Sequence, residues 1–237
     1  MPAPPLSHTF DSDQADTTVI TTGNSVTGGN AFSAITGSPT YSATNARSGT
    51  LAMGIDTTAA VENHADWTGL GSITTSVWFR AYCYFTANPT AQSVRLIGAR
   101  TSAAANSGFV VLETAGTLRG MNAAQTGIGS SSAAISLNQW IRVEWRIVSS
   151  TTVGELEVWL YNNPEDPIES FTSHLTNTAA VLGANTDGVR YGSATATGPA
   201  SYIFWMDDIA VSSTSQIGPF RALNVPTEFP PRHFGPF

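Results

Sequence analysis

The chain has 237 residues, of which 41% are hydrophobic and 11% are charged, and its formal net charge is −7. The ten basic residues are all arginines, and without a basic run this composition excludes a protein that follows nucleic-acid phosphates. Cys83 is the single cysteine, which excludes an intrachain disulfide framework, and no apolar run approaches the roughly 18 residues of a membrane span.

The domain organisation follows from length and from the composition of the two ends. The opening MPAPPLSHTF has neither a basic stretch nor an apolar core, so we expect no ordinary signal peptide. All-β sandwiches of about 200 to 250 residues commonly form one domain. We therefore expect an N-terminal extension at 1–6, one domain at 7–213, and a C-terminal arm rich in proline and phenylalanine at 214–237.

The predicted elements are mostly strands. A single helical turn is expected within TTAAVENHADW (57–67), and nothing else has a helical period. The predicted strands are SVWFRAYCYF (76–85), GFVVLE (108–113), QWIRVEWRIV (139–148), ELEVWLYN (155–162) and YIFWMDDIAV (202–211). The short link SSTTVG predicts that 139–162 is one β-hairpin. Short strands separated by Gly, Ser, Asn and Pro predict an all-β, two-sheet antiparallel jelly-roll sandwich with an extended C-terminal arm.

Four pieces of the chain, in this order over about residues 6–213, carry a resemblance to a known superfamily. They are HTFDSD, SVWFRAYCYF, the hairpin of NQWIRVEWRIV and ELEVWLYN, and WMDDIAV. The chain resembles the concanavalin A-like lectin/glucanase superfamily, and most closely its laminin-G-like branch. The resemblance implies two curved sheets packed face to face, with a concave sheet that can hold carbohydrate or protein ligands.

Lysine-poor acidic domains of this kind also resemble bacteriophage virion proteins, either minor tail proteins or capsid decorations. This likeness implies a non-enzymatic structural protein of the virion, assembled in the host cytoplasm. Its partners would be other virion proteins, including copies of itself, and a host-surface glycan. Neither nucleic-acid binding nor membrane insertion is expected.

An enzyme of the same fold, a soluble glycosidase or polysaccharide lyase, is the alternative, and a free lectin-like domain of a cell is a third hypothesis. Glycosidases of this fold carry the strand motif E-x-D-x-x-E. Here Glu155-Leu156-Glu157 lacks the aspartate, and Leu160 stands at the third acid position. The lyase signatures are also missing, and we expect the four histidines (His8, His64, His174 and His233) at the surface. No catalytic residue is therefore assigned.

The polar faces of three predicted strands form the candidate ligand site. Sugars stack their C–H faces on aromatic rings and bond their hydroxyls to planar charged groups. The alternative is a cross-strand ladder that only stabilises the sheet, at about 0.2–1 kcal/mol per pair. The candidate glycan- or protein-binding residues are Trp78, Arg80, Tyr82, Tyr84, Arg142, Glu144, Trp159 and Tyr161.

The doubled acid Asp207–Asp208 lies within a predicted strand, so alternation points one carboxylate to each face unless a bulge intervenes. A buried carboxylate needs hydrogen-bond donors or a cation. The resemblance implies one calcium ion near this motif, with help from Asp11 in the N-terminal strand, and Ca²⁺ takes six to eight oxygen ligands. The alternative is that these aspartates cap backbone amides in a turn.

The C-terminal arm carries four phenylalanines among five prolines in GPFRALNVPTEFPPRHFGPF (218–237). Proline limits regular strand pairing, so the arm is expected to be extended, and its rings need pockets elsewhere. Docking on a neighbouring subunit is favoured over docking on the parent domain. Truncation after Ser215 is then expected to leave the melting temperature nearly unchanged. The candidate docking residues are Phe220, Phe229, Phe234 and Phe237.

Overall fold

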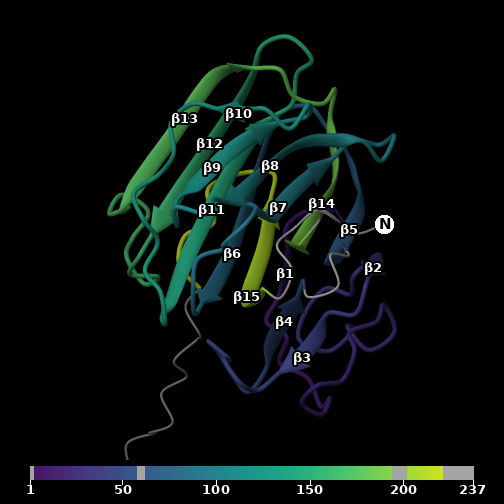
Figure 1. Ribbon diagram of the computed structural model, residues 1–237. Helices are drawn as coiled ribbons and strands as arrows, with labels where there is room; N and C mark the ends of the chain where they lie inside the picture. The colour runs from purple at the N-terminus through teal and green to yellow at the C-terminus, as the bar shows by residue number, and fades with distance from the viewer. Residues whose placement is uncertain (1–2, 58–61, 194–201, 221–237) are drawn as a thin grey trace, which may run out of the picture.

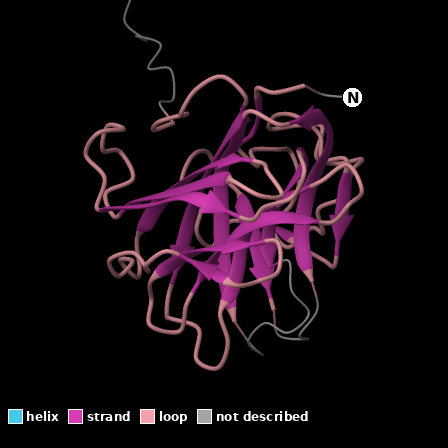
Figure 2. Cartoon of the chain, turned by 90° about the horizontal axis from the view of Figure 1, so that it is seen from above, coloured by secondary structure: helices cyan, strands magenta, loops and turns pink. Residues whose placement is uncertain are grey.

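The computed structural model describes residues 3–57, 62–193 and 202–220, and the described chain is built from strands and loops (Figure 2). No helix among the described residues is long and apolar enough to cross a membrane. Fifteen strands of the described residues form two antiparallel sheets (Figure 1). This confirms the predicted all-β, two-sheet sandwich.

Sheet A has the strand order β13-β12-β11-β6-β15-β4-β3, and β1 also pairs with β15. Its strands are β1 (Leu6–His8), β3 (Thr40–Ser42), β4 (Ala52–Asp56), β6 (Ser76–Phe85), β11 (Trp140–Val148), β12 (Gly154–Tyr161), β13 (Ser173–Ala180) and β15 (Ile203–Ser212). The predicted hairpin is confirmed as β11 and β12, which pair antiparallel from Val148↔Glu155 to Arg142↔Tyr161.

Sheet B has the strand order β10-β9-β8-β7-β14-β5-β2. Its strands are β2 (Ala34–Thr36), β5 (Asn63–Ile73), β7 (Val94–Arg100), β8 (Asn106–Leu112), β9 (Leu118–Asn122), β10 (Gly127–Ile128) and β14 (Thr186–Ser193). Of these strands, only β8 is predicted from the sequence.

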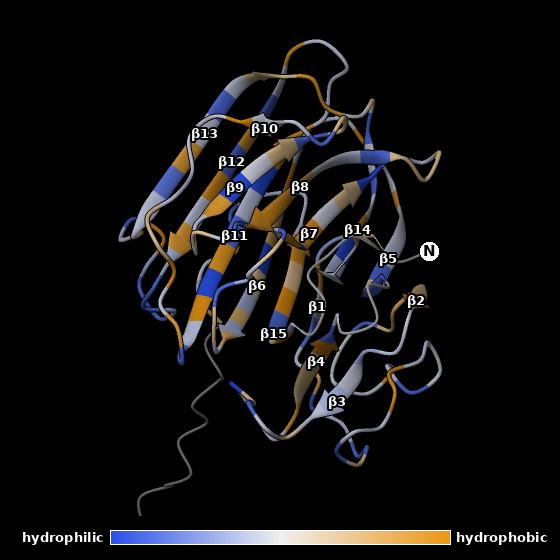
Figure 3. Ribbon diagram, viewed as in Figure 1, coloured by the Kyte–Doolittle hydropathy of each residue, from blue (hydrophilic) through white to orange (hydrophobic). Residues whose placement is uncertain are grey.

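The core lies between the two sheets, and alternation decides which side chains enter it. Along β6 and β11 the odd-numbered residues, Phe79 and Trp145 among them, are buried in the core, and their rings lie 4.8 Å apart. Figure 3 shows the matching alternation of hydrophobic and hydrophilic residues along these strands. The polar residues of sheet A therefore share its outer face, as the sequence pattern indicates.

The predicted helical turn at 57–67 is wrong where the structure describes it. Residues 58–61 lie outside the described residues, and β5 begins at Asn63. Ala65 and Trp67 enter the core, whereas His64 and Asp66 belong to the opposite face. This is the two-residue period of a strand. Over only five residues of mixed polarity, 63–67, the period is too short to be recognised from the sequence, because pairing with neighbouring strands decides the structure.

The expectation that the histidines lie at the surface is also wrong for two of them, because His8 and His64 are buried. The backbone N–H of Phe10 donates to Nδ1 of His8 at 2.9 Å, so the proton is on Nε2, which donates to the carbonyl oxygen of Ser25 at 3.0 Å. Burial lowers the pKa of His8 to about 4. His8 is therefore a neutral structural residue at neutral pH.

Candidate functional site

A bulge in β7 places two arginines on the outer face of sheet B. Residues five apart in a regular strand point to opposite faces. The pairing of β7 with β8 shifts its register between Arg95 and Ile97, so that Leu96 and Ile97 both enter the core. Arg95 and Arg100 consequently both belong to the outer face.

A row of paired residues crosses this face between five strands. Arg190 of β14 pairs with Asp66 of β5 on one side and with Gly98 of β7 on the other. Gly98 in turn pairs with Phe109 of β8, which pairs with Met121 of β9. Since Gly98 has no side chain, the row has a low point at this position. Asp66 and Arg190 on one side of it form the charged half of the row, and Phe109 and Met121 on the other side form the apolar half.

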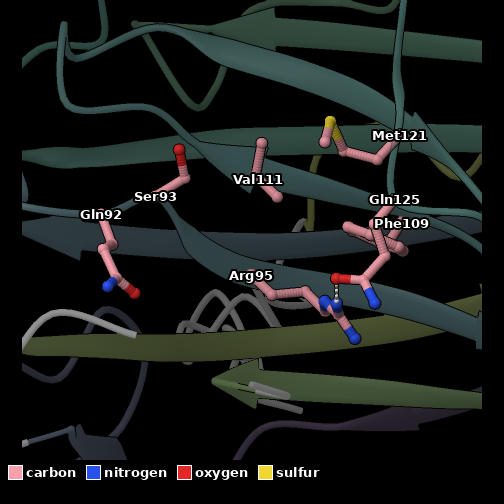
Figure 4. A pocket seen from close by; sticks show the side chains of 7 residues that line it. All are labelled: Gln92, Ser93, Arg95, Phe109, Val111, Met121 and Gln125. Atoms are coloured by element: carbon pink, nitrogen blue, oxygen red, sulfur yellow. Dashed lines mark hydrogen bonds between the residues drawn. The ribbon is translucent and has the colours of Figure 1, made fainter. Parts of the chain in front are cut away.

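The apolar half of the row borders a cavity of about 190 Å³ (Figure 4). The guanidinium of Arg95 lies over the Phe109 ring, 3.8 Å from its centroid, and Nη2 donates to Oε1 of Gln125 at 3.3 Å. Arg95 is only 8% exposed. The residues that line this cavity are Gln92, Ser93, Arg95, Phe109, Val111, Met121 and Gln125.

The charged half borders a second cavity of about 120 Å³, lined by Arg100, Arg190, Asp66 and Asp187 together with Thr68, Thr101, Ser102, Ala104 and Gly188. Asp187 accepts from the backbone N–H groups of Gly71 and Ser72 at 3.0 and 2.6 Å. Its carboxylate therefore holds the turn at the end of β5.

The arginines of this face differ in their partners. Arg190 Nε contacts Asp66 at 3.2 Å, and Nη1 lies 3.6 Å from the Glu62 carboxylate. His64 lies between the same two carboxylates, at 2.7 Å from Asp66 and 3.1 Å from Glu62. Arg190 is thus neutralised locally by two acids that also contact His64.

Arg95 and Arg100 have no carboxylate within ion-pair distance among the described residues, and Nε of each is buried without a hydrogen-bond partner there. Burial lowers the pKa of both guanidinium groups. For Arg95 the charge of Glu62 raises the pKa in part and that of Arg190 lowers it, and for Arg100 the charge of Arg190 lowers the pKa further while Asp66 and Glu62 raise it in part. Both remain charged, because an arginine starts from a pKa above 12. This face therefore holds two positive charges that the described chain does not pair.

Sheet A brings together the eight residues predicted as a ligand site, and all of them lie on its outer face. Arg80 pairs with Glu144 and Glu144 with Trp159, while Tyr82 pairs with Arg142 and Arg142 with Tyr161. Six of the eight are nevertheless closed off from solvent: Arg80, Tyr82, Arg142, Glu144, Trp159 and Tyr161 are each at most 6% exposed.

The cover over this face consists of the C-terminal strap, which we define as residues 213–220, and the 163–170 loop. Arg80 donates to the carbonyl oxygen of Gly218 at 2.9 Å, and the Gly218 N–H donates to Glu144 at 3.3 Å. The N–H of Phe220 donates to the Tyr82 hydroxyl at 2.6 Å. From the loop, the carbonyl oxygen of Pro164 accepts a hydrogen bond from Arg142.

Trp78 and Tyr84, the two remaining members, are half-buried and lie at opposite ends of the covered region. Trp78 stacks on Trp159 at 5.4 Å, and Trp159 stacks on His174 at 4.6 Å, so these rings contact one another. Such stacking is the cross-strand ladder that the sequence offers as the alternative. Ligand binding by the set as a whole stays a prediction, and it requires the strap to leave.

The acids considered for an enzymatic motif, Glu155 and Glu157, are on the same sheet. Both contact Nη1 of Arg146 at 2.7 Å. Since each carboxylate is paired with the same guanidinium, they form an ion cluster across β11 and β12 rather than two acids with separate roles.

A bulge also decides where Asp207 and Asp208 point. The pairing of β15 with β6 shifts its register between Asp207 and Ala210, and Asp208 has a φ of 45°. Both carboxylates consequently reach the turn at 47–50 on the outer side of sheet A. Asp207 accepts from the N–H groups of Arg47 and Ser48 at 2.9 and 3.2 Å.

The same turn engages Asp208 and Asp11. Asp208 forms an ion pair with Arg47 and accepts from the Ser48 hydroxyl at 2.9 Å. Asp11 accepts from the Thr50 N–H at 2.8 Å, and its carboxylate approaches Gly49 so closely that a Cβ there would overlap it. Gly49 has a φ of 59°, so glycine is required at this position for two reasons.

These carboxylates do not fit a calcium ion as they are placed. Their oxygens face N–H and O–H donors and a guanidinium, which are the partners of an anion and not of a cation. Among the described residues, no three His, Cys, Asp or Glu side chains are grouped so that they could hold a metal ion. Calcium binding stays a prediction from the resemblance, and it would require Arg47 to move away.

Burial raises the pKa of Asp207, and the neighbouring charge of Asp208 raises it further, against the three backbone N–H donors. Burial likewise raises the pKa of Asp208, whereas Arg47 lowers it. The pair therefore holds its negative charge less readily than ordinary aspartates do.

Of the four predicted docking phenylalanines, only Phe220 is described, and it packs on its own domain. Its ring centroid lies 5.9 and 5.7 Å from the guanidinium carbons of Arg47 and Arg80. Phe229, Phe234 and Phe237 lie outside the described residues. The first part of the arm thus contacts its own domain, which favours the alternative of an internal brace for this part. The effect of truncation after Ser215 on the melting temperature stays to be measured.

The two cavities on sheet B are not predicted from the sequence. The sequence feature that could have pointed to them is the pair of arginines, Arg95 and Arg100, in VRLIGAR (94–100), a short apolar segment with a charge near each end. Their five-residue spacing places them on opposite faces of a regular strand, and only the bulge brings them together.

No family model matches the sequence, and a search of curated proteins returned no match. Among solved structures, the chain is similar to Cip1, a cellulose-induced protein, with a TM-score of 0.60 and 15% identity over 90% of this chain and 98% of that one. It is also similar to the Trypanosoma rangeli sialidase in complex with sialic acid (TM-score 0.52, 8% identity, 87% of this chain) and to the receptor-binding domain of botulinum neurotoxin type G (TM-score 0.51, 7% identity, 88% of this chain). The chain spans 30% of the sialidase and 47% of the neurotoxin domain. At these identities the likeness shows the fold alone, a two-sheet β-sandwich.

Proposed function

We propose that the chain is a carbohydrate-binding sandwich whose ligand lies on the outer face of sheet B, at the cavity over Phe109. The observation that carries this proposal is the guanidinium of Arg95 over the Phe109 ring, with Gln92 and Gln125 at the same cavity. Phe109 is buried beneath this guanidinium, so the surface open to a ligand is the guanidinium plane together with the half-buried Met121 and the exposed glutamines. Planar polar groups beside an apolar side chain suit the two-sided chemistry of a sugar ring. The names of two structural neighbours, a cellulose-induced protein and a sialidase, agree with a glycan ligand.

We further propose that binding proceeds without cleavage. Glycoside hydrolysis takes two carboxyl groups with separate acid and base roles. The two acids at the second cavity, Asp66 and Asp187, are held by Arg190 and His64 and by backbone amides. The residues that line either cavity include neither a tyrosine nor a histidine to serve as the base of a lyase.

Membership of a bacteriophage virion stays the broader proposal for where this binding would be used. The three neighbours named above are not described as virion proteins, so the proposal depends on the sequence resemblance alone. Mass spectrometry of purified virions would test it. Finding the chain in no particle fraction would leave a free lectin-like domain as the better hypothesis.

Binding is tested by retention of the full chain in native gels that contain a panel of host-wall and plant polysaccharides. The variant Arg95→Met keeps an apolar stem over Phe109 but removes the guanidinium, and we expect it to lose retention. Trp78→Ala removes an aromatic ring from the face of sheet A that was first predicted as the site, and we expect it to bind normally. The reverse result would assign the ligand to sheet A and overturn the proposal.

Absence of cleavage is tested by incubating the chain with the same polysaccharides. We expect no new reducing or unsaturated ends. Turnover that is lost in Asp66→Asn would place catalysis at the second cavity and contradict the non-enzymatic part of the proposal.

A further inference from the structure

We infer that the glycan bound on sheet B is acidic, and that Arg95 binds its negatively charged group, a carboxylate or a sulfate, in the first cavity. The inference rests on the proposed function and narrows it to a class of ligand.

The charge of the first cavity is the first step. Arg95 is the only charged residue among those that line it. Only 8% of Arg95 is exposed, and one of its nitrogens, Nε, has no hydrogen-bond partner among the described residues. A guanidinium removed from water without an anion is unfavourable. An anionic group on the ligand would supply the missing partner.

The neighbouring arginines extend this positive field. Arg100 also lacks a carboxylate partner among the described residues, whereas Arg190 is paired with Glu62 and Asp66. The lowered pKa values of Arg95 and Arg100 reflect burial first and repulsion from Arg190 as well, and the more distant charge of Glu62 offsets this only in part. A bound anion would relieve that repulsion, so the same charges that disfavour the empty site favour its complex.

Gly98 explains how one ligand could use both halves of the face. It pairs with Arg190 on the side of the second cavity and with Phe109 on the side of the first. With no side chain at this position, a sugar ring can lie directly on the backbone of β7 between the two cavities. A Cβ added to Gly98 would meet only the Cβ of Phe109, at 3.7 Å, which is an ordinary contact. Glycine is therefore not required there by packing.

The positions of the acids on the outer face of sheet B indicate which cavity binds the anionic group of the ligand. Asp187 lines the second cavity and holds the turn at Gly71 and Ser72, and Asp66 lines the same cavity. A carboxylate or sulfate placed there would lie beside these two acids, which offset the charges of Arg100 and Arg190, whereas no acid lines the first cavity. For this reason we assign the anionic group to Arg95 and the uncharged part of the ligand to the second cavity.

The test uses two pairs of polysaccharides that share a backbone and differ in charge. Polygalacturonate is compared with its methyl ester, and dextran sulfate with dextran, by affinity electrophoresis and calorimetry of the full chain at low and moderate salt. We expect the charged member of at least one pair to bind about tenfold more tightly than the neutral one, and this preference to weaken as salt rises. The first pair reports a carboxylate and the second a sulfate.

Three variants locate the effect. Arg95→Met and Gly98→Val should each weaken binding of the charged polysaccharide about tenfold, the first by removing the charge and the second by occupying the low point of the row. Arg119→Met is the matched control, because Arg119 is on β9 of the same sheet, lies outside both cavities and loses the same unit of charge. Melting temperatures measured in parallel show whether each variant is folded.

Each other result is decisive as well. Equal binding of charged and neutral polysaccharides would overturn the inference and leave the proposed carbohydrate binding intact. An equal loss in Arg95→Met and Arg119→Met would indicate diffuse attraction to an acidic polymer and would also overturn it. Failure to bind any of the four polymers, or any of the panel above, would reject both.

Discussion

The charged side chains on the outer faces of the two sheets differ in whether they are paired and whether other segments cover them. On sheet A, each buried arginine of the described residues contacts an acid or a backbone carbonyl, and the strap and the 163–170 loop together cover the cluster. On sheet B, two arginines lack an acid among the described residues and line open cavities. The charged groups of the covered face are Arg47, Arg80, Arg142, Glu144, Asp207 and Asp208. The paired charges on sheet A stabilise the fold and are covered, whereas the unpaired charges of Arg95 and Arg100 line cavities that a ligand can enter.

The largest expected effect would come from breaking the matched cluster. Glu144→Gln keeps the shape of the side chain but leaves Arg142, whose Nε lies 2.9 Å from Glu144, without its buried counter-charge. We expect a loss of about 3–5 kcal/mol in the free energy of unfolding. Arg95→Met on the open face should cost less than about 1 kcal/mol, because no described acid depends on it. Urea denaturation of both variants measures the contrast, and equal losses would remove the distinction between the two faces.

A smaller effect is expected when the cover is removed. Truncation after Ser215 deletes the hydrogen bonds that Gly218 and Phe220 make with Arg80, Glu144 and Tyr82. At about 1 kcal/mol for each of these bonds, stability should fall by about 3 kcal/mol. Truncation after Phe220 retains all three bonds and serves as the control. If the chain that ends at Ser215 melts at the same temperature as this control, the strap does not brace the domain.

A third comparison concerns the pH dependence of the covered face, where burial raises the pKa of Asp207 to about 8 although three backbone N–H donors oppose the rise. A pKa raised on folding favours the protonated carboxyl in the native state. Its stabilisation is complete below the unfolded pKa of about 4 and is lost as pH rises toward the folded value. Asp207→Asn cannot titrate, so the stability of the wild type relative to this variant should decline from pH 4 upward. A relative stability that rises with pH would mean that folding lowers this pKa.

Alternation made much of sheet A predictable. The residues of β6, β11 and β12 divide cleanly between core and outer face, and the short link at 149–154 left only a hairpin as the connection. The missed strand β5 shows the limit of this reasoning, because its alternation at 63–67 is too short to outweigh a helical interpretation.

The candidate site was less predictable, because bulges and covering segments depend on pairing across the whole fold. One extra residue in β7 brings Arg95 and Arg100 to one face, and one in β15 does the same for Asp207 and Asp208. Nothing local in the sequence marks either bulge. Nor does the pattern of β6 and β11 reveal that Gly218, far along the chain, will close over their polar face.

The lone thiol of Cys83 gives this molecule an internal reporter. It lies in the centre of sheet A on β6, fully buried between the sheets, and burial raises its pKa so that the reactive thiolate is scarce. An alkylating reagent can therefore reach it only when the sandwich opens. Because no other cysteine exists in the chain, every alkylation event reports on this one position. The rate of alkylation under native conditions would follow the opening of the sandwich, with no engineered label.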